Sequence, residues 1–371
     1  MKSLPLLPLF LILWLLGPGA ALAQQAVSAS STTQGAQDEP QATFNDEVFV
    51  QLFSVKVRAL DHEGSPLVGL GPKDFKVKVE KERVDVVAVD WIPAGPQPAV
   101  VSSPVNQPLE PHPPQQEIEE TPRLVVFFVQ TSAVPHRATG LRWALKHIDT
   151  VLDALHPTDR VAVVDFHHHL KMRRDFTHQR RDIRRALEEA ILFKDTAPVP
   201  PAEPPSLAAG FDPERAFDAG FVETGLEVTA DALRDLPGEK LVIFLGWGFG
   251  SEYGVAIEGA PTPRLRSALD ALHRAEATVS ALAVGNLLSH GTSNLDRSIE
   301  RVAAATGGGY AKLFPMMDLA IQRLSRTLEG HYLVTFAVDS LETQGKVVVS
   351  LRKRRFSAHH REFFLQRAQD S

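Results

Sequence analysis

The sequence contains no cysteine, and this absence removes several kinds of chemistry. The chain forms no disulfide framework, carries no thiolate nucleophile and offers no thiolate ligand for zinc. Attachment of lipid to a cysteine behind a leader is excluded as well. With 371 residues the chain is long enough to be stabilised by an ordinary hydrophobic core instead.

An excess of positive charge is also missing. The formal net charge is −6, whereas binding to nucleic acid requires a surplus of lysine and arginine that neutralises phosphates. We therefore expect no nucleic-acid partner.

Long apolar runs are absent except at the N-terminus. There a basic start precedes an apolar stretch (residues 4–16), and Ala21 and Ala23 form a small-residue cleavage site. We interpret residues 1–23 as a signal peptide and expect a mature periplasmic or extracellular protein that begins near Gln24. An uncleaved anchor or a buried core helix is the alternative, although the run is short for a membrane span. A cysteine-free exported chain favours a bacterial origin.

The next segments differ in composition. Residues 24–43 are rich in Gln, Ala, Ser and Thr and are expected to form a flexible leader. Residues 44–92 alternate between apolar and polar side chains, which predicts a small β unit. Residues 93–122 are rich in proline, which removes backbone donors and predicts an extended linker.

Residues 123–330 alternate between apolar strands and amphipathic helices. Leu124–Val129 is apolar throughout, as in a parallel strand that helices cover on both faces. This pattern predicts an α/β fold with a doubly wound, mostly parallel sheet. Within it, Thr177 is expected to cap a helix, and a single helix is expected to run from Asp212 to about Leu236.

The last segment, residues 331–371, returns to a β pattern. A few isolated strands bury too little apolar surface to be stable alone. We therefore expect this segment to pair with residues 44–92 in an additional small β domain.

The order of these segments resembles that of the von Willebrand factor A-related (VWFA) domain proteins of acidobacteria and neighbouring bacteria. Local strings strengthen the resemblance through their order and spacing. They are Asp61–Leu70 followed by Lys73–Phe75, Asp159–Phe166, Phe176–Thr177, Leu236–Lys240 and Thr306–Gly308. The resemblance covers nearly the whole mature chain and implies a VWFA-like sheet of the Rossmann type.

Domains of this family usually hold a divalent cation in a metal-ion-dependent adhesion site at the carboxyl edge of the sheet. The first loop of that site reads D-x-S-x-S and a later Asp follows the fourth strand, because hard cations need such oxygen donors. The corresponding residues here are Gln130, Ser132, Val134 and Gly246. Both carboxylates are missing, so the resemblance implies a degenerate site without metal or cofactor. A domain with weak divalent-cation-dependent adhesion is an alternative.

The sequence contains no G-x-S-x-G or H-E-x-x-H motif of an enzyme. We therefore favour an exported, non-catalytic protein-binding or scaffold module whose partner is another protein of the cell envelope. Open α/β sheets bind ligands beyond the carboxyl ends of their strands. The candidate partner-binding residues at this edge are Thr131, Ser132, Trp247, Phe249 and Tyr253.

The rival hypothesis is a metal-dependent enzyme built on His167, His168 and His169. In extended geometry the first and third of these side chains would share a face. Zinc or copper would need a further ligand, for which Asp165 and His178 are the candidates. The simpler interpretation of the three histidines is a solvated hairpin tip.

The densest basic run is Arg352-Lys353-Arg354-Arg355. It suits anionic lipid headgroups or an acidic partner such as the stretch at Glu117–Glu120. The simpler interpretation is a solvated edge strand whose charges prevent edge-to-edge aggregation.

Overall fold

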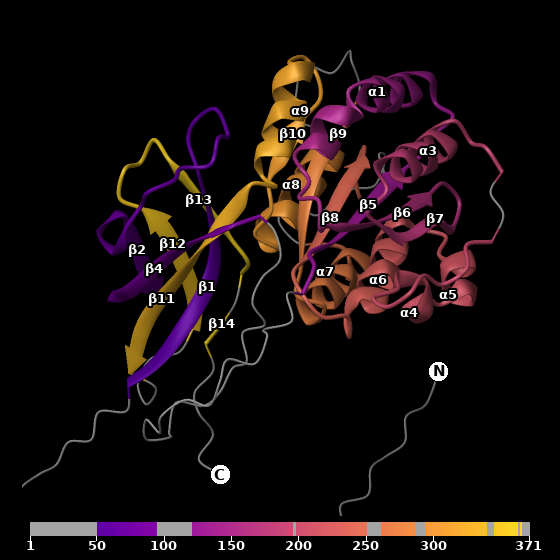
Figure 1. The fold of residues 1–371 in the computed structure, drawn as a ribbon. Coiled ribbons are helices and arrows are strands. Elements are labelled where there is room, and N and C mark those ends of the chain that lie inside the picture. The colour runs from indigo at the N-terminus through magenta and orange to yellow at the C-terminus, as the bar shows by residue number, and fades with distance from the viewer. Residues whose placement is uncertain are drawn as a thin grey trace, which may run out of the picture. The chain divides into compact units, whose positions relative to one another are not determined.

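The computed structural model describes residues 50–94, 121–195, 198–250, 261–285, 294–339, 345–362 and 364–365. All of them belong to one compact unit. Within it we distinguish an α/β part (121–328) from a β part (50–94 and 330–365), shown in Figure 1. The expected signal peptide, the leader and residues 95–120 of the expected linker lie outside the described residues.

The α/β part is built on a six-stranded sheet with the order β10-β9-β8-β5-β6-β7. Neighbouring strands are parallel except β6 and β7, which form an antiparallel hairpin. The strands are β5 (Leu124–Gln130), β6 (Arg160–Phe166), β7 (Leu170–Thr177), β8 (Lys240–Gly246), β9 (Ala277–Ala283) and β10 (Tyr310–Lys312). Every residue of β5 and β8 is buried, which explains the continuous apolar runs Leu124–Val129 and Leu241–Leu245.

Helices cover both faces of this sheet and bury a separate apolar core on each (Figure 1). One face carries α1 (Pro135–Lys146), α2 (Ile148–Asp153), α3 (Arg180–Ile191) and α9 (Met317–Arg326). The other carries α4 (Leu207–Gly210), α5 (Pro213–Asp218), α6 (Val222–Leu233), α7 (Pro263–Arg274) and α8 (Asn294–Ala305). The predicted α/β class with a mostly parallel sheet is confirmed. Of the helices in the described ranges, none is long and apolar enough to cross a membrane.

The β part consists of two four-stranded sheets that share one apolar core. The first has the order β13-β1-β11-β4 and the second the order β14-β12-β2-β3. Before the α/β part come β1 (Val50–Leu60), the 3-10 helix η1 (Pro72–Asp74), β2 (Phe75–Val79), β3 (Glu82–Val84) and β4 (Val86–Pro93). After it come β11 (Gly330–Asp339), β12 (Gly345–Leu351), β13 (Ser357–His360) and β14 (Phe364–Leu365).

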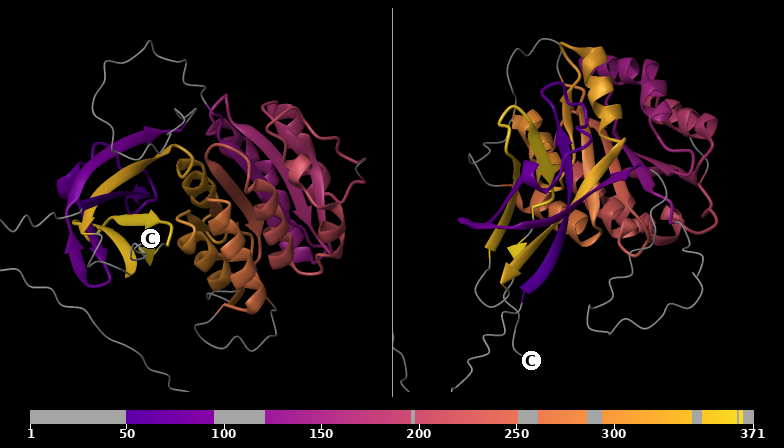
Figure 2. Two further views of the ribbon diagram at one scale, coloured as in Figure 1. Left: turned by 90° about the horizontal axis from the view of Figure 1, so that it is seen from below. Right: turned by 60° about the vertical axis from the view of Figure 1, so that its left-hand side comes forward.

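Strands from both ends of the described chain lie side by side in these sheets. β1 pairs antiparallel with β11 and with β13, and β2 pairs antiparallel with β12. Figure 2 shows the indigo and yellow strands interleaved in both views. The α/β part is thus inserted between strands of the β part; the segment boundaries assigned from the sequence stay predictions.

Two local helix predictions are wrong. The helix expected after Asp212 is divided into α5 and α6, because Ala219 leaves the helical region (φ −70°, ψ 79°) and Phe221 is extended. Thr177 does not cap α3, which begins at Arg180. Its hydroxyl instead accepts a hydrogen bond from the backbone N–H of Gln179, in the turn before the helix.

Candidate functional site

The candidate site lies at the carboxyl edge of the parallel sheet, which we define as residues 130–134 after β5 and 246–250 after β8. β5 and β8 are adjacent parallel strands in the same register, with Val129 opposite Leu245. Both loops therefore leave the sheet at the same edge, where ligands of open α/β sheets bind. The structure brings Gln130 and Gly246 together, as expected for two positions of one site.

The side chain of Gln130 is buried and links the two loops. Its Nε2 donates to the carbonyl of Gly248 at 3.0 Å. Its Oε1 accepts from the backbone N–H groups of Trp247 at 2.9 Å and Gly248 at 3.2 Å. One neutral amide therefore satisfies three backbone groups of the loop after β8 and holds it against the end of β5.

Steric contacts explain why positions 246 and 248 of this loop are glycines. A Cβ on Gly246 would lie 2.6 Å from Oε1 of Gln130 and 2.6 Å from the Phe244 ring. Gly248 has φ +138°, and its Cβ would lie 2.5 Å from the Cβ of Leu295. A carboxylate side chain at position 246, where the family resemblance places an Asp, therefore does not fit beside Gln130 and Phe244.

The hydroxyl groups after β5 are engaged in local hydrogen bonds. Ser132 Oγ accepts from the backbone N–H of Val134 at 3.1 Å. Thr131 Oγ1 donates to the carbonyl of Phe166 at 3.3 Å. Both side chains are buried, whereas Val134 is 40% exposed where it precedes α1.

Trp247 is the accessible aromatic side chain among the described candidates. It is half-buried, and the guanidinium of Arg137 on α1 lies 4.7 Å from the centre of its ring. Phe249 is buried against Phe244 at a centroid distance of 4.7 Å, and its N–H donates to Ser298 Oγ. Tyr253 lies outside the described residues.

The three histidines of the rival hypothesis lie in the bend between β6 and β7 rather than in an extended strand. Their rings are 4.0 Å apart for His167 and His168, and His167 also packs against Phe193. His169 instead packs against Phe217 at 5.1 Å. The expectation that the first and third histidines share a face is wrong, because the bend directs them to different neighbours.

The additional ligands suggested for this cluster have other contacts. Asp165 is buried, and Arg173 binds both of its oxygens, with 3.2 Å between Nη2 and Oδ2. Burial raises the pKa of Asp165, although Arg173 opposes this shift. His178 Nδ1 lies 3.4 Å from Nη1 of Arg160. Within the described part of the chain, no group of three His, Asp or Glu side chains is arranged to hold a metal ion.

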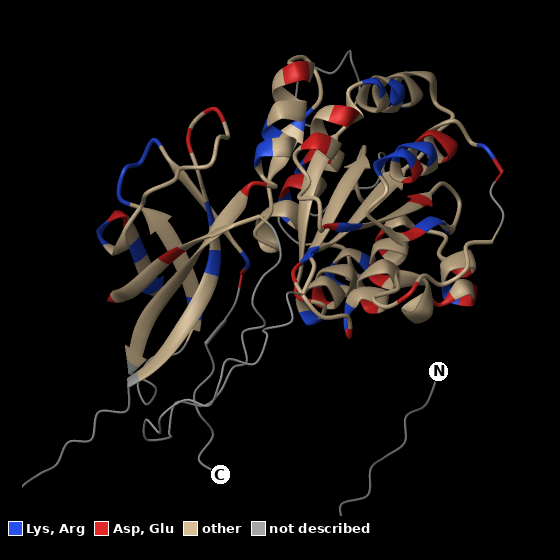
Figure 3. Ribbon diagram, in the orientation of Figure 1, with Lys and Arg blue, Asp and Glu red and all other residues tan. Residues whose placement is uncertain are grey.

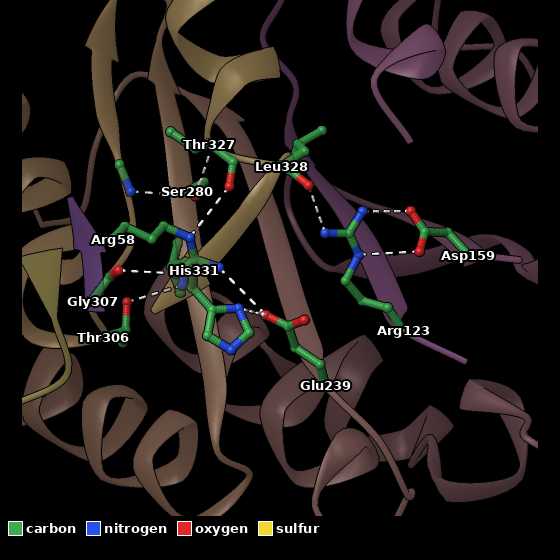
Figure 4. A network of polar contacts seen from close by, with 12 residues as sticks. Arg58, Arg123, Asp159, Glu239, Ser280, Thr306, Gly307, Thr327, Leu328 and His331 are labelled. Carbon is green, nitrogen blue, oxygen red and sulfur yellow. Dashed lines mark hydrogen bonds and ion pairs between the residues drawn. The ribbon is translucent and has the colours of Figure 1, made fainter. Parts of the chain in front are cut away.

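A buried polar network that sequence reasoning missed joins the β part to the α/β part (Figure 4). Arg58 of β1 donates from Nε to the carbonyl of Thr327 at 3.3 Å and from Nη1 to that of Gly307 at 3.0 Å. Its Nη2 lies 3.5 Å from Oε1 of Glu239, and His331 Nδ1 lies 3.7 Å from the same oxygen. The one sequence signal for this network is Arg58 itself, a cation within the apolar end of β1.

A second buried ion pair lies beside this network (Figure 4). Arg123 binds both oxygens of Asp159, at 3.1 Å from Nε and 2.6 Å from Nη2. Its Nη1 donates to the carbonyl of Leu328, and Asp159 also accepts from the N–H of His156. Through its bond to Leu328, Arg123 connects the start of β5 to the segment that follows α9.

Burial and the neighbouring charges determine which side chains of this network are charged. Loss of solvation lowers the pKa of His331 to about 4, against the opposing effect of Glu239. Burial alone would raise the pKa of Glu239, but the neighbouring His331 and Arg58 hold it below its usual value. The histidine is therefore neutral and the glutamate charged near neutral pH.

Comparisons with known proteins leave the family open. No protein-family model matches the sequence, and a search of curated proteins finds no match. Among solved structures, BatB of Bacteroides thetaiotaomicron is 14% identical over 55% of this chain and 98% of that chain, with a TM-score of 0.35. A von Willebrand factor type A protein of Catenulispora acidiphila is 10% identical over 85% and 72%, with a TM-score of 0.38. Manganese-loaded TRAP of Plasmodium vivax is 11% identical over 66% and 93%, with a TM-score of 0.34. Values this low establish no relationship.

Proposed function

We propose that this protein is an exported, non-catalytic binding module of the VWFA type. It holds another protein of the cell envelope at the carboxyl edge of its parallel sheet, without a metal ion. The observation that carries the proposal is the side chain of Gln130. Its amide already joins the two loops that a cation would join in the family that the sequence resembles.

The chemistry of the edge supports binding without a cation. Hard divalent ions give up hydration water only for strong oxygen donors, and carboxylates tune the affinity. Residues 130–134 and 246–250 contain no Asp or Glu. The Ser132 hydroxyl already accepts a backbone N–H, and the oxygen of Gln130 accepts two.

The exposed part of the edge suits a protein partner. Trp247 packs in part against the core and leaves part of its large ring exposed, with the Arg137 guanidinium 4.7 Å from the ring centre, and Val134 is 40% exposed where it precedes α1. Tryptophan and arginine dominate the energetics of many protein interfaces, since they combine large contact area with directed polar groups. Thr131, Ser132 and Phe249 then support this surface from the interior.

The proposal is tested by affinity capture from envelope extracts with the full chain. Trp247→Ala should weaken capture of the main partner at least about tenfold, since truncating a central aromatic typically costs 2 kcal/mol or more. Leu52→Ala is the control, because Leu52 is 58% exposed on β1 and belongs to the β part rather than to the carboxyl edge. Equal loss with both variants would contradict the assignment of the binding surface.

Metal independence needs its own measurement. Capture should be unchanged by EDTA, and calorimetric titration with Mg²⁺, Mn²⁺ or Ca²⁺ should give no specific binding. A stoichiometric micromolar site that disappears in Ser132→Ala would show that the edge still holds a cation. The alternative of residual cation-dependent adhesion would then replace the proposal.

A further inference from the structure

The outer face of the sheet β14-β12-β2-β3 carries closely spaced cations. In β2 three buried apolar residues alternate with Lys76 and Lys78, which therefore point away from the core. Lys78 lies opposite Arg83 of β3 and opposite Val348 of β12. These three cations thus share one face of the sheet, and Val348 lies among them, 41% exposed.

The basic run Arg352–Arg355 extends this face. It forms an exposed turn between β12 and β13, not the edge strand that we expected from the sequence. The N–H of Arg352 donates to the carbonyl of Asp74, which ties the turn to the start of β2. Figure 3 shows the turn as a continuous blue segment. We call Lys76, Lys78, Arg83 and Arg352–Arg355 the cationic face.

The nearby carboxylates form no ion pair with these cations in the described structure. Asp74 and Glu80 keep their charge but accept backbone N–H groups, from Gly71 and Lys346. The Lys346 ammonium pairs with Glu362 at 2.7 Å. Glu82 lies opposite the inward-facing residue Val79 and so belongs to the other face of the sheet.

The cationic face forms no ion pairs of its own within the described residues, and Arg355 instead lies over the ring of Phe356 at 4.7 Å. None of its seven side chains forms an ion pair with any residue that the structure describes. The full chain nevertheless carries a net charge of −6, so the positive charge is a local feature. A face of this kind attracts anions over roughly a Debye length, about 10 Å at 0.1 M salt.

We propose that the cationic face binds the anionic surface of a lipid membrane. On the strands, side chains of one face recur about every 7 Å along a strand and about every 5 Å between strands, so Lys76, Lys78 and Arg83 spread their charges over a surface. Charges spread in this way match a layer of phosphate headgroups better than they match one compact ligand. Two cavities of the described structure, one beside Leu60 and Tyr310 and one beside Met172 and Phe211, include no residue of the cationic face. Val348 adds an apolar contact at the centre.

The surface is separate from the carboxyl edge, so the two proposals fail or succeed independently. Each Lys or Arg close to an anionic leaflet is worth about a fivefold gain in binding. Loss of two cations should therefore lower the partition coefficient about 30-fold. Rising salt should weaken binding in the same direction, because it screens exposed charges.

The test is co-sedimentation of the full chain with vesicles that contain phosphatidylglycerol, against vesicles of phosphatidylcholine alone. The zwitterionic vesicles measure what the apolar stretch 4–16 contributes. Preference for the anionic vesicles should fall about 30-fold in Lys76→Gln/Lys78→Gln. The matched control is Arg142→Gln/Lys146→Gln, which removes the same charge from exposed positions of α1. Circular dichroism melts confirm that both variants fold.

Several outcomes would overturn the proposal. One is equal binding of the unaltered chain to both kinds of vesicle, and another is an equal loss in the two double variants. A third is binding of soluble polyglutamate that depends on Lys76 and Lys78 without binding to vesicles, which would indicate an acidic protein partner instead. Trp247→Ala should leave vesicle binding unchanged, and this result separates the cationic face from the carboxyl edge.

Discussion

At the scale of single residues, Gln130 links two loops through hydrogen bonds of fixed geometry rather than through the charge of a cation. A cation can bridge two loops through its field, whereas an amide does so only when its donor and acceptors meet fixed backbone groups. Here the amide meets one carbonyl and two N–H groups of residues 247 and 248. Gly246 leaves the space that the amide oxygen occupies. The two positions therefore depend on each other.

We expect Gln130→Ala to lower the free energy of unfolding by about 2–3 kcal/mol. The substitution leaves buried backbone groups of Trp247 and Gly248 without partners, and each unsatisfied group costs about 1–3 kcal/mol before relaxation or water entry. Urea unfolding followed by fluorescence measures the change. Gln179→Ala is the control, because Gln179 is exposed and its side chain makes no capping bond. A loss below about 0.5 kcal/mol for Gln130→Ala would disprove the bridging role.

The sequence identified Gln130 as the position of a missing carboxylate, but not as a bridge. Hydrogen bonds from a side chain to a distant backbone depend on the path of the second loop, which no local pattern specifies. For the same reason, the sequence could not separate Trp247, which reaches the surface, from Phe249, which is buried. Both are aromatic residues in one short glycine-rich loop.

At the scale of elements, one buried carboxylate holds the proline-rich loop that precedes α4, residues 198–206. Asp175 of β7 accepts hydrogen bonds from the N–H groups of Ala202 at 2.7 Å and Leu207 at 2.8 Å. It also accepts from the hydroxyl of Ser206 at 2.6 Å, and that hydroxyl in turn caps α4. Proline gives this loop few N–H groups of its own, so its attachment depends on these few contacts.

Asp175→Asn should therefore release the loop while the sheet remains folded. In the variant, the amide nitrogen faces a hydrogen-bond donor at one of these contacts and cannot accept from it. We therefore expect the free energy that holds the loop in place to fall by about 2–3 kcal/mol. Limited proteolysis should show faster cleavage within residues 198–207, and hydrogen exchange should show lower protection of Leu207. Asp195→Asn, at an exposed position near the start of the same loop, is the control. Equal cleavage rates in the two variants would rule out the anchoring role.

Elements with a strong local signal could be predicted, and a break with a weaker signal was missed. The runs Leu124–Val129 of β5 and Leu241–Leu245 of β8 are apolar because both faces are covered, so their parallel arrangement follows from the sequence. The break between α5 and α6 does carry a local signal, because Gly220 lies in it and glycine disfavours the interior of a helix. The expectation of a single helix after Asp212 gave this glycine too little weight, because the apolar spacing continues across it.

At the scale of the whole molecule, the joint between the β part and the α/β part is polar and buried. Arg58 reaches two carbonyls and one carboxylate across it, and Arg123 holds a further carbonyl beside it. Breaking a buried ion pair on one side leaves the other charge without compensation, which typically costs 3–5 kcal/mol. The joint therefore favours one relative placement of the two parts, since other placements would leave these buried polar groups without partners.

This joint should make stability depend on pH through His331. Its pKa is about 4 in the folded protein and about 6.5 in an unfolded chain, so the unfolded state binds more protons between these values. The contribution of the neutral His331 to the free energy of unfolding is therefore fully present above pH 6.5 and is lost as the pH decreases to about 4. A shift of this size corresponds to about 3 kcal/mol.

His331→Gln should remove that part of the pH dependence, because glutamine does not titrate. Urea unfolding at several pH values between 4 and 7 measures it as the difference in slope between the two proteins. His62→Gln is the control, since His62 is exposed in the turn after β1 and should keep the slope of the unaltered chain. If His331→Gln and the unaltered chain lost stability in parallel across this range, His331 would have to stay solvated in the folded protein.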